Sequence, residues 1–437
     1  MRVGPSVHFE QIFYPVMQAV AARPKLAGLV FAFDPWGNPL GESYSRDPTS
    51  AVAAMHREGA VTYRTLYRHW VVTGYDEALE VLSRDDLLVG EPIGLLLNVR
   101  PYSKLSPLAQ WTFRNLILVS DPPDHTRLRR MVHREFTSRS ITRLEGRIEA
   151  TAYRLLERLG DKPDGDLTRD FTRPLANAAV ASLIGIPEED WDWSQRMTDV
   201  IVKLLDPLLR FDPETVSATI DELYRYFDAL AEQRKQEPKD DFITAMVRAE
   251  GEEFSRKETI TMALMMLGAG SQTTGGLVGN SILALSRFPD QQALLRENPK
   301  IWPNAVEEFC RFDTSVKFAP RYTPHDMELA GKRIPAGSNI MIQLVAANRD
   351  PRRYDEPDRL RLDRPDPQPL TFGYGIHFCL GAALTRMVLE VGIKAFLDVY
   401  SRFDIEAGRV SWRKSLLLRG ATRMPFSGVR RQAAVSA

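Results

Sequence analysis

The feature that most constrains the fold is a long helix predicted between residues 255 and 289. Ser255 and Glu258 form a capping box ahead of an apolar run, and Pro289 follows the end of that run. Roughly 33 residues lie between these signals, so this helix is about 50 Å long, enough to cross the whole molecule. Its middle reads GAGSQTTGG, which is poor in helix-forming residues. That stretch predicts either a local opening or bend, or close packing against small residues.

The rest of the chain predicts a fold that is mainly α with a minor β part. Helical periodicity runs through residues 123–312, with Pro and Gly between the helices. Residues 62–74 read as a short β-hairpin, and strand signals return in residues 315–372. No linker separates these parts. We therefore interpret residues 46–437 as one large domain and residues 1–45 as an N-terminal extension packed on it.

Composition excludes several classes of function. Lys plus Arg and Asp plus Glu are both 57, and this balance gives no reason to expect nucleic acid or an anionic membrane as a partner. Two cysteines cannot build a disulfide framework, so we expect a reducing, cytoplasmic compartment. The N-terminus lacks the pattern of a secretory signal, and the apolar run at 27–34 is too short to span a bilayer. We predict no transmembrane segment.

One of the two cysteines, Cys379, lies in a glycine-rich loop just before an apolar helical run. Gly373, Gly375 and Gly381 permit positive φ angles and close approach of the backbone to a bulky group. Near a helix N-terminus, free N–H groups and the helix dipole stabilise a thiolate. Such a thiolate can act as a nucleophile, a redox thiol or a metal ligand, whereas a buried free cysteine is usually inert.

The sequence around Cys379 lacks the partners that most of these roles need. A cysteine protease needs a histidine within hydrogen-bond reach, and His377, two residues away in an extended loop, points elsewhere. A zinc site needs further Cys or His at paired spacing, and a dithiol centre needs a second nearby cysteine. An axial thiolate on a haem iron needs no other Cys or His. The pattern therefore favours haem.

Four segments resemble, in the expected order, motifs of the cytochrome P-450 monooxygenases, of the soluble bacterial type. Residues 372–381 match every fixed position of the haem-binding loop, F-x-x-G-x-x-x-C-x-G. Residues 308–311 carry the pair E-x-x-R. AGSQTT at 269–274 is similar to A-G-x-D/E-T-T, and HTRLR at 125–129 is similar to H-x-x-x-R. The resemblance runs from about residue 45 to the C-terminus and implies a haem domain crossed by the long helix.

This resemblance implies haem b (iron protoporphyrin IX) as the cofactor and a role for each matching residue. Cys379 would be the proximal iron ligand, and the other loop residues around it would be Phe372, Gly373 and Gly381. The anionic haem propionates would bind at His125, Arg129, Arg321 and His377. Oxygen activation would involve the long-helix residues Ala269, Gly270, Gln272 and Thr273.

The long helix departs from the family pattern at Gln272, where the family usually has Asp or Glu. In the family that acid and the following threonine help to deliver protons to bound dioxygen. Glutamine cannot relay a proton as a carboxylate does, although it can hold a water. Two outcomes stay open: ordinary monooxygenation through water and Thr273, or slow, leaky or peroxide-supplied oxygen activation.

Glu308 and Arg311 lie three residues apart on one helical face. The resemblance implies that this pair is structural and binds an arginine upstream of the cysteine loop. We expect that arginine to be Arg364, with Arg359 and Arg361 as the other candidates.

The resemblance also implies a substrate pocket over the distal haem face. Its candidate lining is apolar, which favours a lipophilic substrate of terpenoid, steroid, fatty-acid or polyketide type. The residues expected to line it are Leu95, Leu96, Leu97, Trp111, Met266, Ala269, Val316 and Phe318.

Electrons would come from a separate ferredoxin served by an NAD(P)H-dependent ferredoxin reductase, because this chain has no flavin or iron–sulfur sequence. A basic face for that partner is expected from Arg127, Arg130, Arg134 and Arg386. Two other hypotheses remain: a haem-thiolate enzyme that uses peroxide or catalyses oxidative coupling, and a haem protein that binds a ligand or partner without turnover.

Overall fold

The structure is a computed structural model that describes residues 42–65, 68–90, 101–133, 136, 138–160, 165–206, 211–251 and 255–430. Most of these residues are helical, as predicted. The helices are α3 (Glu42–Arg46), α4 (Thr49–Glu58), α5 (Tyr75–Ser83), α7 (Pro107–Arg114), α8 (Asp124–His133), α9 (Ser138–Leu159), α10 (Arg173–Ile184), α11 (Trp191–Ile201), α12 (Pro213–Gln236), α13 (Phe242–Ala249), α14 (Arg256–Arg287), α15 (Pro289–Glu297), α16 (Trp302–Phe312), α17 (Leu344–Ala347) and α18 (Ala382–Val399).

The β part forms one small sheet and three two-stranded ribbons. The strands are β1 (Val61–Arg64), β2 (His69–Val72), β3 (Phe318–Thr323), β4 (Met327–Leu329), β5 (Lys332–Ile334), β6 (Ser338–Gln343), β7 (Tyr400–Asp404), β8 (Ser411–Trp412), β9 (Ala421–Arg423) and β10 (Ser427–Arg430). The four-stranded sheet has the order β1-β2-β6-β3, and its β2–β6 pair is parallel. The ribbons pair β4 with β5, β7 with β10 and β8 with β9.

The predicted hairpin is present as the antiparallel pair β1–β2, in which Val61 faces Val72. The strand signals within residues 315–372 correspond to β3, β4, β5 and β6, the last of which ends at Gln343. From Leu344 onward the chain forms α17 and a series of turns. Prolines and charged residues crowd this stretch, and they disfavour ladder hydrogen bonds and a half-buried strand face.

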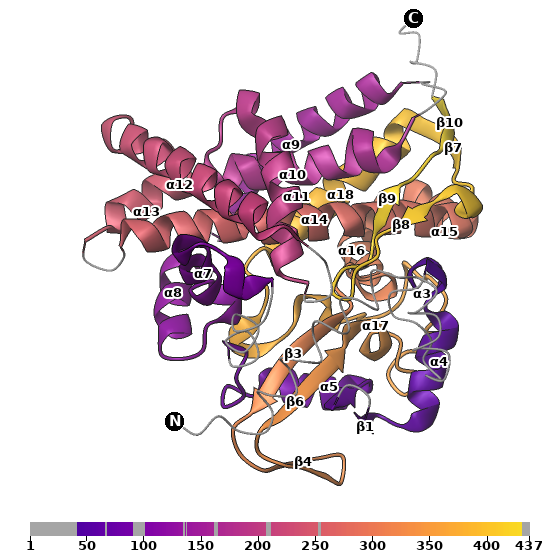
Figure 1. Ribbon diagram of the computed structural model, residues 1–437. Helices are drawn as coiled ribbons and strands as arrows, with labels where there is room; N and C mark the ends of the chain where they lie inside the picture. The colour runs from indigo at the N-terminus through magenta and orange to yellow at the C-terminus, as the bar shows by residue number, and fades with distance from the viewer. Residues whose placement is uncertain are drawn as a thin grey trace, which may run out of the picture.

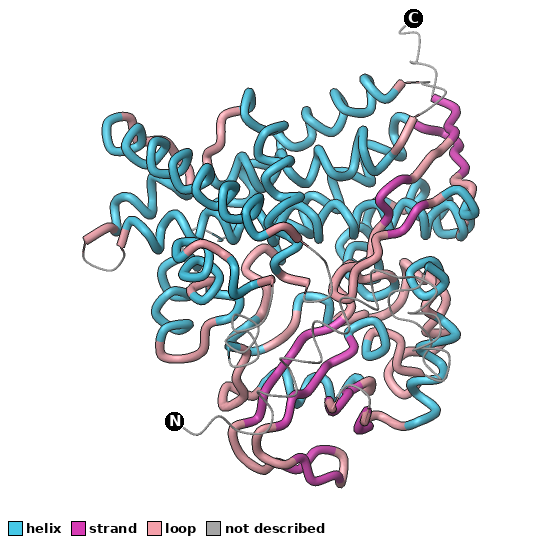
Figure 2. The backbone as a smooth tube through the Cα atoms, viewed as in Figure 1, coloured by secondary structure: helices cyan, strands magenta, loops and turns pink. Residues whose placement is uncertain are grey.

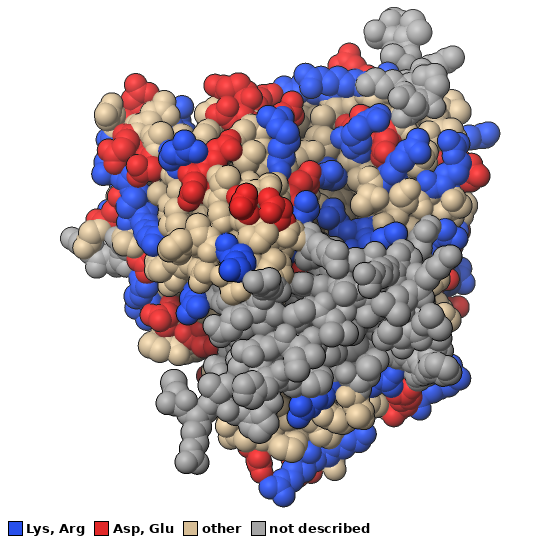
Figure 3. Space-filling model, viewed as in Figure 1, with Lys and Arg blue, Asp and Glu red and all other residues tan. Residues whose placement is uncertain are grey.

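The elements form a helical layer above a smaller part that contains the main sheet (Figures 1 and 2). In Figure 2 the long helices occupy the upper part of the view, and β3 and β6 run side by side below them. Figure 3 shows Lys, Arg, Asp and Glu side chains interspersed on the same face. Within the described residues, no helix has the length and apolar character needed to cross a membrane.

Residues 1–41 lie outside the described part of the chain, so the predicted extension of residues 1–45 is described only at its end. That end opens α3, in which Tyr44 and Ser45 are buried.

Helix α14 begins and ends where the sequence predicts. The Ser255 Oγ accepts a hydrogen bond from the Glu258 backbone N–H at 3.2 Å, and the Glu258 carboxylate accepts one from the Ser255 N–H at 2.9 Å. The helix then continues unbroken for 32 residues, including the glycine-rich middle. Of the two expectations for that middle, the structure shows close packing.

The glycines of α14 are needed where neighbouring elements approach the helix. A Cβ built on Gly270 would lie 2.7 Å from Val180 Cγ2 of α10, and one built on Gly268 would lie 2.9 Å from Ile201 Cγ2 of α11. At Gly275 the nearest atom is the Thr172 carbonyl oxygen, at 3.1 Å. A Cβ atom essentially never comes within 3.0 Å of a non-bonded heavy atom of a neighbouring element, so side chains at Gly268 and Gly270 would push α10 and α11 outward.

Replacing Gly270 with alanine should therefore destabilise the protein in spite of alanine's better helix propensity. We expect the free energy of unfolding to fall by about 1–3 kcal/mol, because Val180 is stiff and cannot move aside. Gly146→Ala on α9 is the matched control, since a Cβ there meets nothing within 4 Å. The control should gain up to about 1 kcal/mol. Urea unfolding checks both, and an equal gain in the two variants would contradict the packing argument.

Candidate active site

The loop of residues 372–381, called the Cys379 loop below, is shaped by two glycines with left-handed backbone. Gly373 has φ 70° and Gly375 has φ 67°, and a Cβ on Gly375 would lie 2.7 Å from the Leu82 carbonyl oxygen. The Cys379 N–H donates a hydrogen bond to the Phe372 carbonyl at 2.8 Å, which closes the loop on itself. Helix α18 starts at Ala382, so Cys379 lies just before a helix N-terminus, as predicted.

The two cysteines have opposite surroundings. Cys310 is fully buried in α16, and burial raises the pKa of its thiol far above the usual range. The Cys379 side chain is exposed. Desolvation by the surrounding atoms raises the pKa of its thiol, whereas the Gly381 N–H and the guanidinium groups of Arg129 and Arg386 lower it. Only Cys379 combines access with neighbours that stabilise a thiolate.

A group of four basic side chains, called the cation cluster below, lies near Cys379. Its members come from α8, β3 and the Cys379 loop: His125, Arg129, Arg321 and His377. The His125 and His377 rings lie 4.2 Å apart between centroids. Desolvation, followed by the charges of His125, Arg321 and Arg129, lowers the pKa of His377 to about 3. Burial also lowers the pKa of Arg321, to about 10.

Several polar atoms of the cation cluster are buried without a hydrogen-bond partner among the described residues. They are His125 Nδ1, Arg321 Nε and His377 Nε2. Within the same part of the chain, neither Arg129 nor Arg321 forms an ion pair with a carboxylate. Unpaired basic groups beside one another are costly unless an anion binds between them. The cluster and the Cys379 thiol together fit a haem, which needs a ligand for its iron and cations for its propionates.

Helix α14 presents one partly accessible face at four-residue intervals. Met265, Ala269 and Thr273 lie on it, and each retains some exposure in an otherwise buried stretch. The Thr273 hydroxyl donates to the Ala269 carbonyl at 2.7 Å. Thr274, on another face, lies within hydrogen-bond distance of Thr385 of α18, at 3.0 Å between hydroxyl oxygens. This contact joins the middle of α14 to the first turn after the Cys379 loop.

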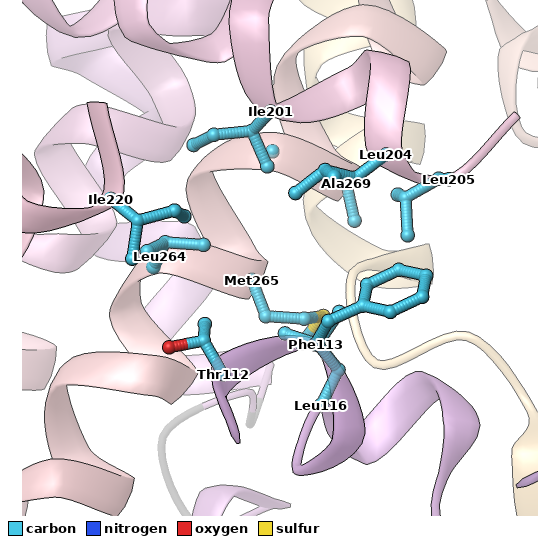
Figure 4. A pocket seen from close by; sticks show the side chains of 11 residues that line it. Thr112, Phe113, Leu116, Ile201, Leu204, Leu205, Ile220, Leu264, Met265 and Ala269 are labelled. Atoms are coloured by element: carbon cyan, nitrogen blue, oxygen red, sulfur yellow. The ribbon is translucent and has the colours of Figure 1, made fainter. Parts of the chain in front are cut away.

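An apolar pocket lies between α7, α11, α12 and α14 (Figure 4). None of the described residues that line it is titratable, and the Thr112 hydroxyl is the polar side-chain group among them. Figure 4 shows the side chains of Ile201, Met265 and Phe113 around the same space. The described lining is Thr112, Phe113, Leu116, Ile201, Leu204, Leu205, Ile220, Leu264, Met265, Gly268 and Ala269.

Of the pocket residues expected from the sequence and described by the structure, this pocket contains Ala269 alone. The Trp111 ring lies beneath Lys257 Nζ, 3.8 Å from it, rather than over the pocket. Met266 follows Met265 by about 100° around the helix and is buried elsewhere. Val316 forms a bridge with Leu418, and Phe318 pairs with Gln343 in the sheet. Leu95, Leu96 and Leu97 lie outside the described residues.

The expected lining and the observed pocket share α7 and α14 but use different faces of these helices, and the residues from α11 and α12 were not expected. Thr112 and Phe113 directly follow the expected Trp111, and Met265 precedes the expected Met266. Ile201, Leu204 and Leu205 belong to no motif, and only the packing of the end of α11 and the turn after it against α14 reveals them. Gly270, expected in the oxygen-activation set, faces Val180 of α10.

Gln272 is held by two polar partners from distant parts of the chain. Its Nε2 donates to Asp199 Oδ1 of α11 at 2.5 Å, and its Oε1 accepts from Arg413 Nη2 at 2.6 Å. Asp199 is in turn ion-paired with Arg173. Gln272 is therefore a fixed bridge between α11 and the segment after β8.

The predicted contact between Glu308 and Arg364 is present, together with the one to Arg311. Arg311 donates from Nε and Nη2 to the two carboxylate oxygens at 2.6 and 2.8 Å, and Arg364 Nε lies 3.1 Å from Oε2. The Glu308 and Arg311 side chains are completely buried. Arg359 and Arg361, the other candidates, contribute backbone groups instead: the Arg359 carbonyl accepts from Arg311, and the Arg361 N–H donates to Glu308.

Removing the charge of Glu308 should be far costlier than removing that of a surface acid. Glu308→Gln leaves two buried guanidinium groups without their carboxylate, and we expect the free energy of unfolding to fall by about 3–5 kcal/mol. Glu188→Gln is the control, because Glu188 pairs with Arg154 on the surface. The control should change by about 0–1 kcal/mol. Urea unfolding of both variants measures the difference, and a loss below about 1 kcal/mol in Glu308→Gln would show that the bonds of Glu308 to Arg311 and Arg364 are not a main source of stability.

The basic face expected for a redox partner is only partly free. Arg127 is ion-paired with Glu258, and Arg386 with Glu307. The Arg386 guanidinium also stacks on Phe372, 4.4 Å from the ring centroid. Arg130 is exposed, and Arg134 lies outside the described residues.

Comparisons with known proteins agree with this geometry. The Cytochrome P450 family model matches residues 99–414 of the chain. The chain is 37% identical over 318 residues to the vitamin D(3) 25-hydroxylase of Pseudonocardia autotrophica, across 71% of this chain and 77% of that protein. It is 33% identical over 372 residues to the 6-deoxyerythronolide B hydroxylase of Saccharopolyspora erythraea, across 82% and 89%. The structure of CalO2 is similar with a TM-score of 0.84 at 28% identity, across 90% of this chain and 98% of that one.

Proposed function

Because the chain belongs to the cytochrome P450 family, and is therefore a haem b-binding monooxygenase of the oxidoreductase class, we propose a specific reaction for it. It inserts one atom of dioxygen into a lipophilic small molecule, by hydroxylation or epoxidation. The two electrons come from a ferredoxin that an NAD(P)H-dependent reductase serves.

The observation that carries this proposal is the pairing of an accessible cysteine with an uncompensated cation cluster. Cys379 would hold the haem iron, and His125, Arg129, Arg321 and His377 would bind the two propionates. A thiolate-ligated haem, when bound, supplies the electron-rich iron that favours cleavage of the O–O bond. The loop restrains the sulfur through the Cys379 N–H bond to Phe372, and Phe372 itself is buried behind it.

The residues of α14 provide the opposite side of the site. Met265 and Ala269 give the substrate an apolar surface, and the Thr273 hydroxyl is the polar group that follows them on the same face. Nearly all of the pocket's described lining is hydrocarbon, so it offers water few hydrogen-bond partners. A substrate bound there would be oriented by shape rather than by fixed charges.

The substrate class follows from the lining of the pocket. Its described residues carry no charge, which favours a ligand with a large hydrocarbon surface. Two of the related proteins are named for action on vitamin D(3) and on 6-deoxyerythronolide B. We therefore place a steroid-like or polyketide-type substrate first, ahead of terpenoids and fatty acids.

A second reaction is kept because of Gln272. An amide cannot relay a proton as a carboxylate does, and this is the reason to test also for a haem-thiolate enzyme that takes its oxygen from peroxide, or that couples two groups oxidatively without inserting oxygen.

Isotopically labelled dioxygen separates these reactions. The holoprotein is incubated with ferredoxin, reductase, NADPH and a panel of steroid, polyketide, terpenoid and fatty-acid substrates. We expect one labelled oxygen atom in the product. An unlabelled coupled product would favour oxidative coupling, and product formed with peroxide alone would favour the peroxide reaction. Absence of product under every condition would overturn the assignment of an oxygenase.

A further inference from the structure

The hydrogen-bond network around Gln272 ends at a carboxylate that reaches solvent. The Asp199 side chain is 46% exposed, and its ion pair with Arg173 holds it beside α14. Arg413 fixes the Gln272 carbonyl oxygen, so the amide nitrogen is directed to Asp199. Next to Gln272 in the sequence is Thr273, which lies on the same partly accessible side of α14 as the pocket residues Met265 and Ala269. Asp199 and Gln272 are thus in direct contact, and Thr273 follows Gln272 on the adjacent face of the helix.

The proposed reaction needs a supply of protons at that site. Substrate C–H, dioxygen, two electrons from the reductase system and two protons give C–OH and water. Both protons must reach the same oxygen atom, which leaves as water. If each oxygen atom receives one proton, the same two electrons are lost as hydrogen peroxide. The route by which protons arrive therefore decides how much reductant yields product.

The residues at the site cannot supply these protons alone. The described lining of the apolar pocket has no titratable side chain. Gln272 has an amide, which neither gains nor loses a proton near neutral pH. The Thr273 hydroxyl donates to the Ala269 carbonyl. After the hydroxyl gives up its proton, another group must return a proton to its oxygen. An acid that exchanges protons with water is required nearby.

Asp199 meets that requirement and the next carboxylate along the chain does not. Asp206 is buried and accepts hydrogen bonds from the Ser415 hydroxyl and the Leu416 N–H. Its carboxylate therefore does not exchange protons readily with bulk water. Asp199 is exposed and touches Gln272 directly.

We propose that Asp199 is the acid that supplies protons to the reaction, in place of the carboxylic acid that position 272 lacks. This inference rests on the proposed monooxygenase function. Asp199 takes protons from water and passes them along Gln272, with an ordered water as carrier, to the Thr273 hydroxyl. Asp199 acts through other groups and does not contact substrate. Gln272 positions the carrier, while the acid resides on α11.

An exchange of the two side chains tests this proposal. Asp199→Asn removes the acid and keeps the shape. The double variant Asp199→Asn/Gln272→Glu moves the carboxylate to α14, where it can still accept from Arg413 and from the amide introduced on α11. Asp228→Asn is the matched control, because Asp228 is an exposed acid paired with Arg256 on the α12 side of the molecule. Each holoprotein is assayed for product per NADPH consumed, peroxide release, solvent deuterium isotope effect and melting temperature.

We expect Asp199→Asn to lower the rate of product formation about 10- to 100-fold, with more peroxide, a changed isotope effect and an unchanged melting temperature. The double variant should recover most of the product yield, and Asp228→Asn should match the wild type. Wild-type yield in Asp199→Asn would overturn the proposal. So would a loss that comes with a lower melting temperature and is not rescued by the double variant, since this indicates a structural role. If the wild type itself forms no oxygenated product, the proposed function fails instead.

Discussion

The passage of α14 through the centre of the helical layer is the constraint on which the rest of the structure depends. A helix of 32 residues with most of its surface buried must be approached closely on several sides at once. Small residues make this possible where α10 and α11 pack against it. The same close packing fixes the side chains that remain: Ala269 in the pocket lining, Thr273 one turn further along the same side, and Gln272 against Asp199.

Charge is distributed unevenly in a molecule whose formal net charge is zero. In the described part of the chain, the four members of the cation cluster lie together with no carboxylate in ion-pair contact with Arg129 or Arg321, and their environment lowers the pKa of His377 and of Arg321. The buried carboxylate of Glu308, by contrast, is compensated by the guanidinium groups of Arg311 and Arg364. This contrast supports the proposal that the cation cluster binds an anion, since an uncompensated buried charge is costly to retain.

Local signals in the sequence predicted much of this arrangement. The capping box at Ser255 and Glu258 predicted the first residue of α14 correctly. The glycine-rich stretch around Cys379 predicted a loop followed by a helix. Both depend on contacts within a few residues. The residues expected to line a pocket differ from those around the apolar pocket, because a shift of one residue turns a side chain by about 100° around a helix. The partners of Gln272 lie 73 and 141 residues away in the chain, and no local pattern marks such contacts.

The central claim is that Cys379, rather than Cys310, ligates the iron of a haem. The absorption spectrum of the purified holoprotein, reduced and exposed to carbon monoxide, tests it most directly. We predict the strongly red-shifted Soret band of thiolate-ligated haem in the wild type and in Cys310→Ser, and its loss in Cys379→Ser. A wild-type protein without haem, or with a band typical of histidine or protonated-thiol ligation, would contradict the account.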